Sequence, residues 1–151
     1  MKELADSAPP PRNVAMNWLA RREHSLAELR TKLAARGYSP QEIEISLKAL
    51  VAEGLVSDER FAESFVAARM RKGQGPVRIR MELQKRGVAA ETIHLHVDDS
   101  ALDWHTLARE VRRKKFGMAK PFEYKEKARQ MRFLEYRGFT GEQISKAVDD
   151  L

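Results

Sequence analysis

The sequence predicts an all-α protein built from three tandem three-helix repeats. Apolar residues recur at the spacing of a helix face, glycines stand where helices would end, and one apolar pattern occurs three times along the chain. No segment shows a convincing alternation of apolar and polar residues, the pattern that indicates a β-strand.

Six of the eight glycines directly follow a run of helix-compatible residues. The residue just past a helix C-terminus often adopts a left-handed conformation, which glycine takes with the least strain. We therefore expect helices to end just before Gly37, Gly54, Gly73, Gly87, Gly117 and Gly138.

Helix start signals lie between these stops. In a capping box, a hydroxyl side chain and an acidic or amide side chain three residues later satisfy free backbone amides. Proline also opens a helix with little strain, because its missing N–H would have no partner there. The predicted starts are the pairs Ser25 with Glu28, Ser39 with Glu42 and Thr140 with Gln143, together with Pro40 and Pro76.

A repeat organises the chain. Three Arg-Gly pairs, Arg36-Gly37, Arg86-Gly87 and Arg137-Gly138, lie 50 and then 51 residues apart. Four apolar columns stay aligned around them: Leu33, Leu83 and Leu134; Tyr38, Val88 and Phe139; Ile43, Ile93 and Ile144; Leu47, Val97 and Val148. We expect three-helix units at 13–55, 56–100 and 101–151, each marginal for an independent core and therefore leaning on its neighbour.

The N-terminal residues 1–12 are expected to form a flexible extension. Pro9, Pro10 and Pro11 stand in a row, and consecutive prolines lack the N–H groups that a helix needs. Folded structure is expected to begin near Asn13.

Composition excludes several classes of protein. The 151 residues carry a formal net charge of +6, and 42% of them are hydrophobic, which is enough for packed cores. Cysteine is absent, so disulfide scaffolds, thiolate zinc sites and cysteine nucleophiles are excluded. No apolar run reaches the roughly 20 residues that a membrane helix needs, and the start of the chain lacks the apolar core of a signal peptide. We expect a soluble, cytoplasmic protein.

No catalytic or metal site is expected. His94 and His96 lie two residues apart on a predicted helix, so they point to different sides instead of forming the i, i+4 pair of a helical zinc site. The turn before Pro76 lacks the lysine of a phosphate-binding loop. The sequence therefore predicts a non-enzymatic protein without cofactor or metal.

Positive charge is concentrated in the third unit. Residues 101–151 contain 12 basic and 8 acidic residues, a net charge of +4, with the densest basic run at 112–115. Cations at helix ends also complement the helix dipole, and we favour this structural role over binding for Arg36, Arg86 and Arg137. Arg78 and Arg80 diverge by about 200° on a helix, so they do not face one ligand together.

Aromatic residues divide into two classes. Trp18, Phe61, Phe65, Trp104 and Phe133 fall on apolar helix faces and are expected in the core, while Tyr38 and Phe139 are expected to cover helix ends. Exposed rings beside cations can stack on nucleic-acid bases. The candidates for stacking are Phe116, Phe122 and Tyr124.

The residues of the repeat also resemble a known family, the RecX regulators of recombination. The resemblance is carried, in order, by residues 21–29 (RREHSLAEL), 53–63 (EGLVSDERFAE), 72–79 (KGQGPVRI) and 137–139 (RGF), together with Leu33 and the Arg36-Gly37-Tyr38 turn. It covers nearly the whole chain from about Val14 onward. Ser57 stands where the family often has Asp, and Ala89-Ala90 replaces a more polar turn.

The resemblance implies an elongated, curved array and a role in recombination, DNA repair and the SOS response. RecX proteins bind the RecA recombinase filament on single-stranded DNA and inhibit its ATPase, strand-exchange and co-protease activities. The implied partners are RecA and DNA, single-stranded and also double-stranded, with no membrane, and we expect a monomer. The candidate contacts are Arg21, Arg22, Arg69, Arg71, Lys72, Arg78, Arg112, Arg113, Lys114, Lys115, Lys125, Arg129 and Arg132.

Two other functions stay open at the level of sequence. Three-helix units with short turns are similar to helix-turn-helix modules, which suggests a stand-alone nucleic-acid-binding protein acting by competition for DNA. No unit, however, has a helix dense in Arg, Asn and Gln for reading base edges. The chain could also be a helical adaptor whose positive charge serves solubility.

Overall fold

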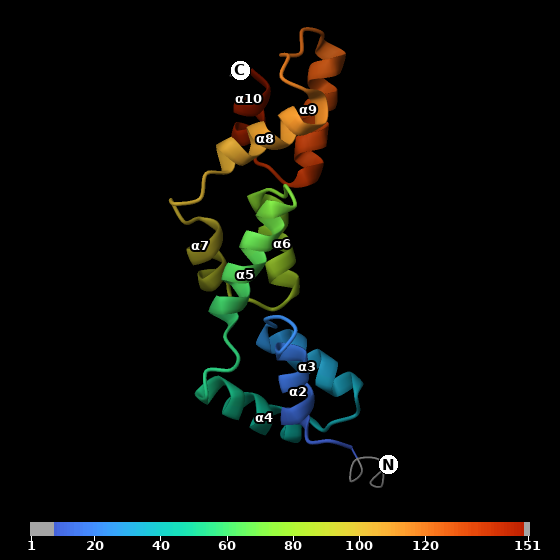
Figure 1. Cartoon of the computed structure of the whole chain (residues 1–151), viewed down its shortest axis with the longest axis vertical. Coiled ribbons are helices and arrows are strands. Elements are labelled where there is room, and N and C mark those ends of the chain that lie inside the picture. Colours follow the sequence, from blue (N-terminus) through green and yellow to red (C-terminus); the bar gives the residue numbers. More distant parts are fainter. Residues whose placement is uncertain (1–7, 150–151) are drawn as a thin grey trace.

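The computed structural model describes residues 8–149, in which every regular element is an α-helix. Nine helices follow one another in three groups along an elongated, curved array (Figure 1). The first group is α2 (Pro11–Leu19), α3 (Leu26–Ala35) and α4 (Pro40–Ala52). The second is α5 (Asp58–Arg71), α6 (Pro76–Lys85) and α7 (Ala90–Val97), and the third is α8 (Trp104–Phe116), α9 (Tyr124–Arg137) and α10 (Gly141–Asp149).

This arrangement confirms the predicted all-α class and the three tandem three-helix units. The divisions expected at 55/56 and 100/101 fall between α4 and α5 and between α7 and α8. Among the described helices, none combines the length and apolar character needed to cross a membrane.

The first helix begins earlier than expected. Pro11 is its first residue, two positions before the predicted start at Asn13, because proline fits the first helical position without losing a hydrogen bond. The N–H groups of Asn13 and Val14 donate to the carbonyl of Pro10 at 3.0 and 3.3 Å. Arg12, which was assigned to the extension, pairs with Glu53 beyond the end of α4. Residues 1–7 of the predicted extension lie outside the described residues.

The predicted helix stops are confirmed, because all six glycines have φ angles between 72° and 96°. The starts at Ser25 and Thr140 are complete capping boxes. At Ser39 the side chain accepts from the backbone N–H of Glu42, but the Glu42 carboxylate accepts the Ser39 hydroxyl proton.

Each group has its own core, and neighbouring groups share residues. The core of the first group includes Val56 from the segment after α4, and the core of the second includes Trp104 from α8. The indole N–H of Trp104 donates to the carbonyl of Val97 at 3.1 Å. Leu107 packs against both the second and the third core. Neighbouring units therefore stabilise each other through shared buried side chains.

The aromatic side chains expected in the core pack there. Phe61 and Trp104 are buried, while Trp18, Phe65 and Phe133 are partly buried against the three cores. The residues after two Arg-Gly pairs also pack inward, with Tyr38 partly buried and Phe139 buried.

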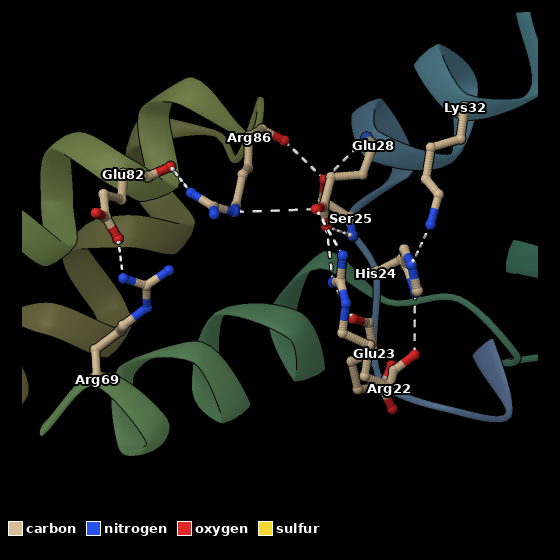
Figure 2. A network of polar contacts seen from close by, with 9 residues as sticks. All are labelled: Arg22, Glu23, His24, Ser25, Glu28, Lys32, Arg69, Glu82 and Arg86. Carbon is tan, nitrogen blue, oxygen red and sulfur yellow. Dashed lines mark hydrogen bonds and ion pairs between the residues drawn. The ribbon is translucent and has the colours of Figure 1, made fainter. Parts of the chain in front are cut away.

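The turn after α6 sits on the N-terminal end of α3, which joins the first two groups. The hydroxyl of Ser25, the N-cap of α3, donates to the carbonyl of Arg86 at 2.7 Å (Figure 2). The Arg86 guanidinium lies 3.9 Å from the Glu28 carboxylate. On the other side of this turn, Glu82 pairs with Arg69 of α5 at 2.7 Å. Charged side chains thus connect three helices across the junction.

The turn after α9 sits on the N-terminal end of α6 in a corresponding way. The N–H groups of Gly75 and Val77 donate to the carbonyls of Arg137 and Gly138, both at 2.8 Å. A Cβ at Gly138 would lie 2.3 Å from the Cβ of Arg78, so this approach requires glycine. In Figure 1, α9, α6 and α3 accordingly follow one another head to tail along the array.

His24 is a buried histidine directly before Ser25, the residue that joins the first two groups. Its ring is buried, its Nδ1 lies 3.1 Å from the carbonyl of Arg22, and its Nε2 lies 3.1 Å from the ammonium of Lys32 (Figure 2). This assigns the neutral tautomer with the proton on Nδ1, since Nε2 accepts from Lys32. Burial lowers the pKa of His24, and the charges of Arg22 and Lys32 act in the same direction.

The stability of the protein is therefore expected to fall as the pH drops below about 6.5, the ordinary histidine pKa. Because the pKa of His24 is lower in the folded protein, the unfolded chain binds a proton at a higher pH than the folded protein does. The stability that depends on neutral His24 is therefore complete above the ordinary histidine pKa and is lost as the pH falls through the folded-state pKa. Melting temperatures between pH 5 and 8 test this. His24→Gln should flatten the dependence of the melting temperature on pH, and an unchanged dependence would contradict the role assigned to His24. His96→Gln, at a histidine that forms no ion pair in the described structure, is the control.

Candidate functional site

A basic groove lies where the second and third groups meet. It is formed by the C-terminal end of α5, the outer face of α8 and the C-terminal half of α9, and has a volume of about 460 Å³. Its lining residues are Met70, Arg71, Lys72, Gly73, Leu107, Glu110, Val111, Lys114, Lys115, Phe133 and Arg137. Five of these side chains are cationic, and only Glu110 is acidic. The groove therefore suits an anionic ligand.

Four of the groove cations are exposed and have no acidic partner. Arg71, Lys72, Lys114 and Lys115 form no ion pair within 4.0 Å in the part of the chain that the structure describes. They come from two helices that are distant in sequence, since α5 ends at Arg71 and α8 spans Trp104–Phe116. The fold thus brings together two basic clusters that the sequence predicted separately.

Phe133 of α9 supplies an aromatic wall to the groove. The Lys115 ammonium lies 5.6 Å from the centre of its ring, and the Arg137 guanidinium lies 5.1 Å from the same centre. A cation over an aromatic face is attracted by the ring quadrupole, which limits the freedom of a long side chain. Phe133 therefore helps to position two of the five cations.

Arg137 fixes the two sides of the groove relative to each other. Its guanidinium donates to the carbonyl of Lys72 at 2.9 Å, which links the end of α9 to the end of α5. The carbonyl of Arg137 in turn accepts from the N–H of Gly75. The groove is therefore held by hydrogen bonds across the junction as well as by the shared core.

Four of the thirteen candidate contacts form ion pairs within the protein. Arg22 pairs with Glu28 at 3.1 Å, Arg69 with Glu82 at 2.7 Å, and Arg78 with Glu82 at 3.6 Å. Arg129 pairs with Glu126 at 3.1 Å. These side chains are less available to a ligand, because a new partner would have to replace an existing ion pair.

Arg112 corrects the sequence-based prediction, because it cannot contact a partner. Its side chain is completely buried between α8 and α9. One end of the guanidinium donates to the side-chain oxygen of Gln130 at 3.1 Å, and the other to the carbonyl of Gly117 at 3.3 Å. Burial lowers the pKa of Arg112. Its role is to hold the segment between α8 and α9, whereas the adjacent Arg113 is exposed.

The remaining candidates lie away from the groove. Lys125 and Arg132 line a second depression along α9 together with Arg129. Arg21 is exposed after the end of α2, in the first group. Arg78 and Arg80 diverge as predicted, since Arg80 turns to Asp98. The structure therefore does not bring all thirteen residues into one surface.

Of the three aromatic rings proposed for stacking, two are free. Phe122 is fully exposed and Tyr124 is 85% exposed, both where α9 begins. Phe116 packs edge-on against Phe133 with the ring centres 5.3 Å apart, and the guanidinium of Arg129 lies over it. Base stacking by Phe122 and Tyr124 stays a prediction.

Sequence reasoning assigned two groove residues to other roles. Arg137 was expected only to complement a helix end, and Phe133 only to fill the core. The recurring Arg-Gly pair singled out Arg137 in the sequence, but it indicated only the end of a helix. It did not indicate the groove, which forms only where two units pack together. Among residues 8–149, no group of three or more His, Asp or Glu side chains is placed to hold a metal ion.

Comparison with known proteins identifies the family. Residues 12–50, 57–94 and 103–148 match the first, second and third three-helix domains of RecX, respectively. The chain is 45% identical to the regulatory protein RecX of Halorhodospira halophila over 148 residues, 98% of this chain and 92% of that one. It is 43% identical to the regulatory protein RecX of Pseudomonas fluorescens, again over 98% of this chain and 96% of the relative.

The fold is also similar to a solved structure. The crystal structure of RecX from Lactobacillus salivarius superimposes with a TM-score of 0.76 over 93% of this chain and 94% of that one, at 20% sequence identity. The likeness in fold agrees with the likeness in sequence, and it confirms the resemblance that the residues of the repeat had indicated. The chain belongs to the RecX family of regulatory proteins.

Proposed function

We propose that this protein is a cytoplasmic regulator that binds the RecA recombinase filament on single-stranded DNA. In this role it inhibits the ATPase, strand-exchange and co-protease activities of the filament. Membership of the RecX family is the observation that carries the proposal. The protein acts by binding and catalyses no reaction.

The basic groove supports a contact with the nucleoprotein filament. Lysine and arginine attract phosphates and release the counterions around them, which makes such binding strong and sensitive to salt. Arg71, Lys72, Lys114 and Lys115 form no ion pair in the part of the chain that the structure describes, so within it they give up no partner to bind. The groove therefore meets either the DNA backbone or an acidic surface of the recombinase.

The elongated shape supports a contact with more than one recombinase subunit. Three units follow one another along the array, so the outer units reach neighbours when the central one is bound (Figure 1). A ligand shifts a conformational equilibrium only by the difference in its affinity for the two states. Inhibition then results from tighter binding to the inactive arrangement of the filament.

The test is the single-stranded-DNA-dependent hydrolysis of ATP by RecA, titrated with this protein at a fixed salt concentration near 0.15 M. Inhibition at substoichiometric protein that persists after excess DNA is added supports action on the filament. Inhibition only at saturating protein, relieved by more DNA, would instead favour competition for the strand. No inhibition and no binding would reject the proposal.

The double variant Lys72→Glu with Lys114→Glu measures the part played by the groove. We expect the concentration for half-inhibition to rise by roughly tenfold or more, because two phosphate-binding cations become repulsive. The matched control is Lys48→Glu with Lys120→Glu, which makes the same change in net charge at exposed positions outside the groove. An equal effect of both double variants would mean that only overall charge matters.

A further inference from the structure

The junction between the first two groups has the same arrangement of cations as the basic groove at the next junction. In each place, one cation stands three residues before a helix N-cap, one stands twelve residues after another N-cap, and one belongs to an Arg-Gly turn. The corresponding residues, first junction before groove, are Arg22 and Lys72, Arg69 and Lys115, and Arg86 and Arg137. In each place the last two cations lie over one phenylalanine ring, Phe65 at the first junction and Phe133 in the groove. The two junctions therefore offer a direct comparison within one molecule.

At the first junction, carboxylates of this chain neutralise the three cations. Arg22 pairs with Glu28 at 3.1 Å, and the Arg86 guanidinium lies 3.9 Å from the same carboxylate (Figure 2). Arg69 pairs with Glu82 at 2.7 Å. Both glutamate side chains are only 17% exposed. The first junction is therefore an acid-binding arrangement that the protein fills itself.

The groove keeps the cations of this arrangement and lacks both of its acids. The residue three positions after the helix N-cap is Glu28 in α3 and Arg78 in α6. The residue four positions before the arginine of the turn is Glu82 in α6 and Phe133 in α9. The acidic residue of the groove lining, Glu110, forms no ion pair within 4.0 Å in the part of the chain that the structure describes. The groove is therefore the open counterpart of the first junction.

The groove also has an apolar part. Its apolar lining residues are Met70, Leu107, Val111 and Phe133. All four are partly buried against the second and third cores, whereas Arg71, Lys72, Lys114 and Lys115 are exposed. The apolar side chains thus lie deeper than these charges. A ligand that fills the groove needs an apolar group surrounded by negative charge.

We propose that the basic groove binds an acidic segment of the recombinase, in which carboxylate side chains flank a large apolar side chain. This inference rests on the function proposed above and names the chemistry of the partner at the same site. The carboxylates of the segment pair with Lys72 and Lys115, as Glu28 and Glu82 pair with the corresponding cations of the first junction. The apolar side chain of the segment covers the partly buried lining residues.

Single-stranded DNA suits this groove less well than an acidic peptide. Its phosphates match the cations, but its backbone offers no apolar group for the deeper part of the groove. A base would stack on Phe133, the aromatic residue of the lining. That ring packs against Phe116, and Lys115 and Arg137 already lie over it. A stacked base would therefore displace cations that the phosphates need.

The double variant Lys72→Glu with Lys114→Glu distinguishes the two partners when two affinities are measured. One is the affinity for the RecA filament, and the other is the affinity for a fluorescent thymidine oligonucleotide without recombinase, both near 0.15 M salt. We expect the Kd for the filament to rise about tenfold or more. The Kd for the oligonucleotide should change no more than in the control, Lys48→Glu with Lys120→Glu. A larger loss of oligonucleotide binding than in the control would assign the groove to DNA and overturn the proposal.

Two synthetic peptides test the apolar part of the groove without the recombinase. One has a leucine between two pairs of glutamates, and the other has a serine in place of the leucine, so their charges are equal. Fluorescence anisotropy of the labelled peptides should show that the wild-type protein binds the leucine peptide about tenfold more tightly, because a leucine is removed from water. The double variant Lys72→Glu with Lys114→Glu should lose this binding. Equal affinity for the two peptides, or binding of neither, would overturn the proposal.

The outcomes separate this inference from the proposed function. If the wild type inhibits the filament while the groove variant matches its control and the leucine peptide is not preferred, the acidic segment is rejected and the regulatory function stands. If the leucine peptide binds as expected while the RecA filament is neither bound nor inhibited, the proposed function fails. The recombinase is then rejected as the source of the segment.

Discussion

Replacing Gly138 with alanine is expected to lower the free energy of unfolding by about 4 kcal/mol, against about 1 kcal/mol for the same change at Gly54. Both residues have positive φ, so both substitutions strain the backbone. At Gly138 the new Cβ would also lie 2.3 Å from the Cβ of Arg78 and 2.8 Å from its backbone nitrogen. The third group would have to move, which endangers the hydrogen bond from Val77 to the Gly138 carbonyl.

Urea unfolding followed by circular dichroism at 222 nm measures this difference. Gly54 is the matched control because it also ends a helix and has nothing within 4 Å of an added Cβ in the described structure. An equal decrease in the free energy of unfolding at both positions would mean that the junction between the second and third groups accommodates the added Cβ without strain. A transition that splits into two steps would show that the third group had uncoupled from the other two.

Replacing Arg112 with methionine is expected to lower the free energy of unfolding by about 3 kcal/mol. Methionine keeps much of the side-chain volume but removes every donor. The buried side-chain oxygen of Gln130 and the carbonyl of Gly117 would then lose their partner. Leaving buried acceptors unpaired is more damaging than removing both partners of a hydrogen bond.

Arg113→Met is the control for this prediction, since Arg113 is the next residue, is exposed and forms no ion pair in the described structure. We expect its free energy of unfolding to stay within about 0.5 kcal/mol of the wild type. Hydrogen exchange adds a local measurement, because amides of the segment between α8 and α9 should lose protection in Arg112→Met alone. Equal behaviour of the two variants would show that Arg112 does not hold that segment.

The sequence by itself determined the helices and their order in this protein. Helix ends depend on residues close in the chain: a glycine such as Gly37 permits the left-handed turn, and a serine such as Ser25 satisfies the first amides. The repeat was visible because equivalent helices bury equivalent apolar positions, from Leu33 to Leu134. One local error, the helix start at Pro11, came from giving three prolines the same role when the last of them fits the first helical position.

Only the tertiary structure decided which basic residues share a surface. Arg112 and Arg113 are neighbours in sequence, yet one is buried and the other exposed, because adjacent residues on a helix point about 100° apart and only the packing of α9 defines the inside. Lys72 and Lys114 line one groove because the second and third groups meet there. Contacts between residues far apart in the chain depend on how whole units pack, and no local pattern of residues records that packing.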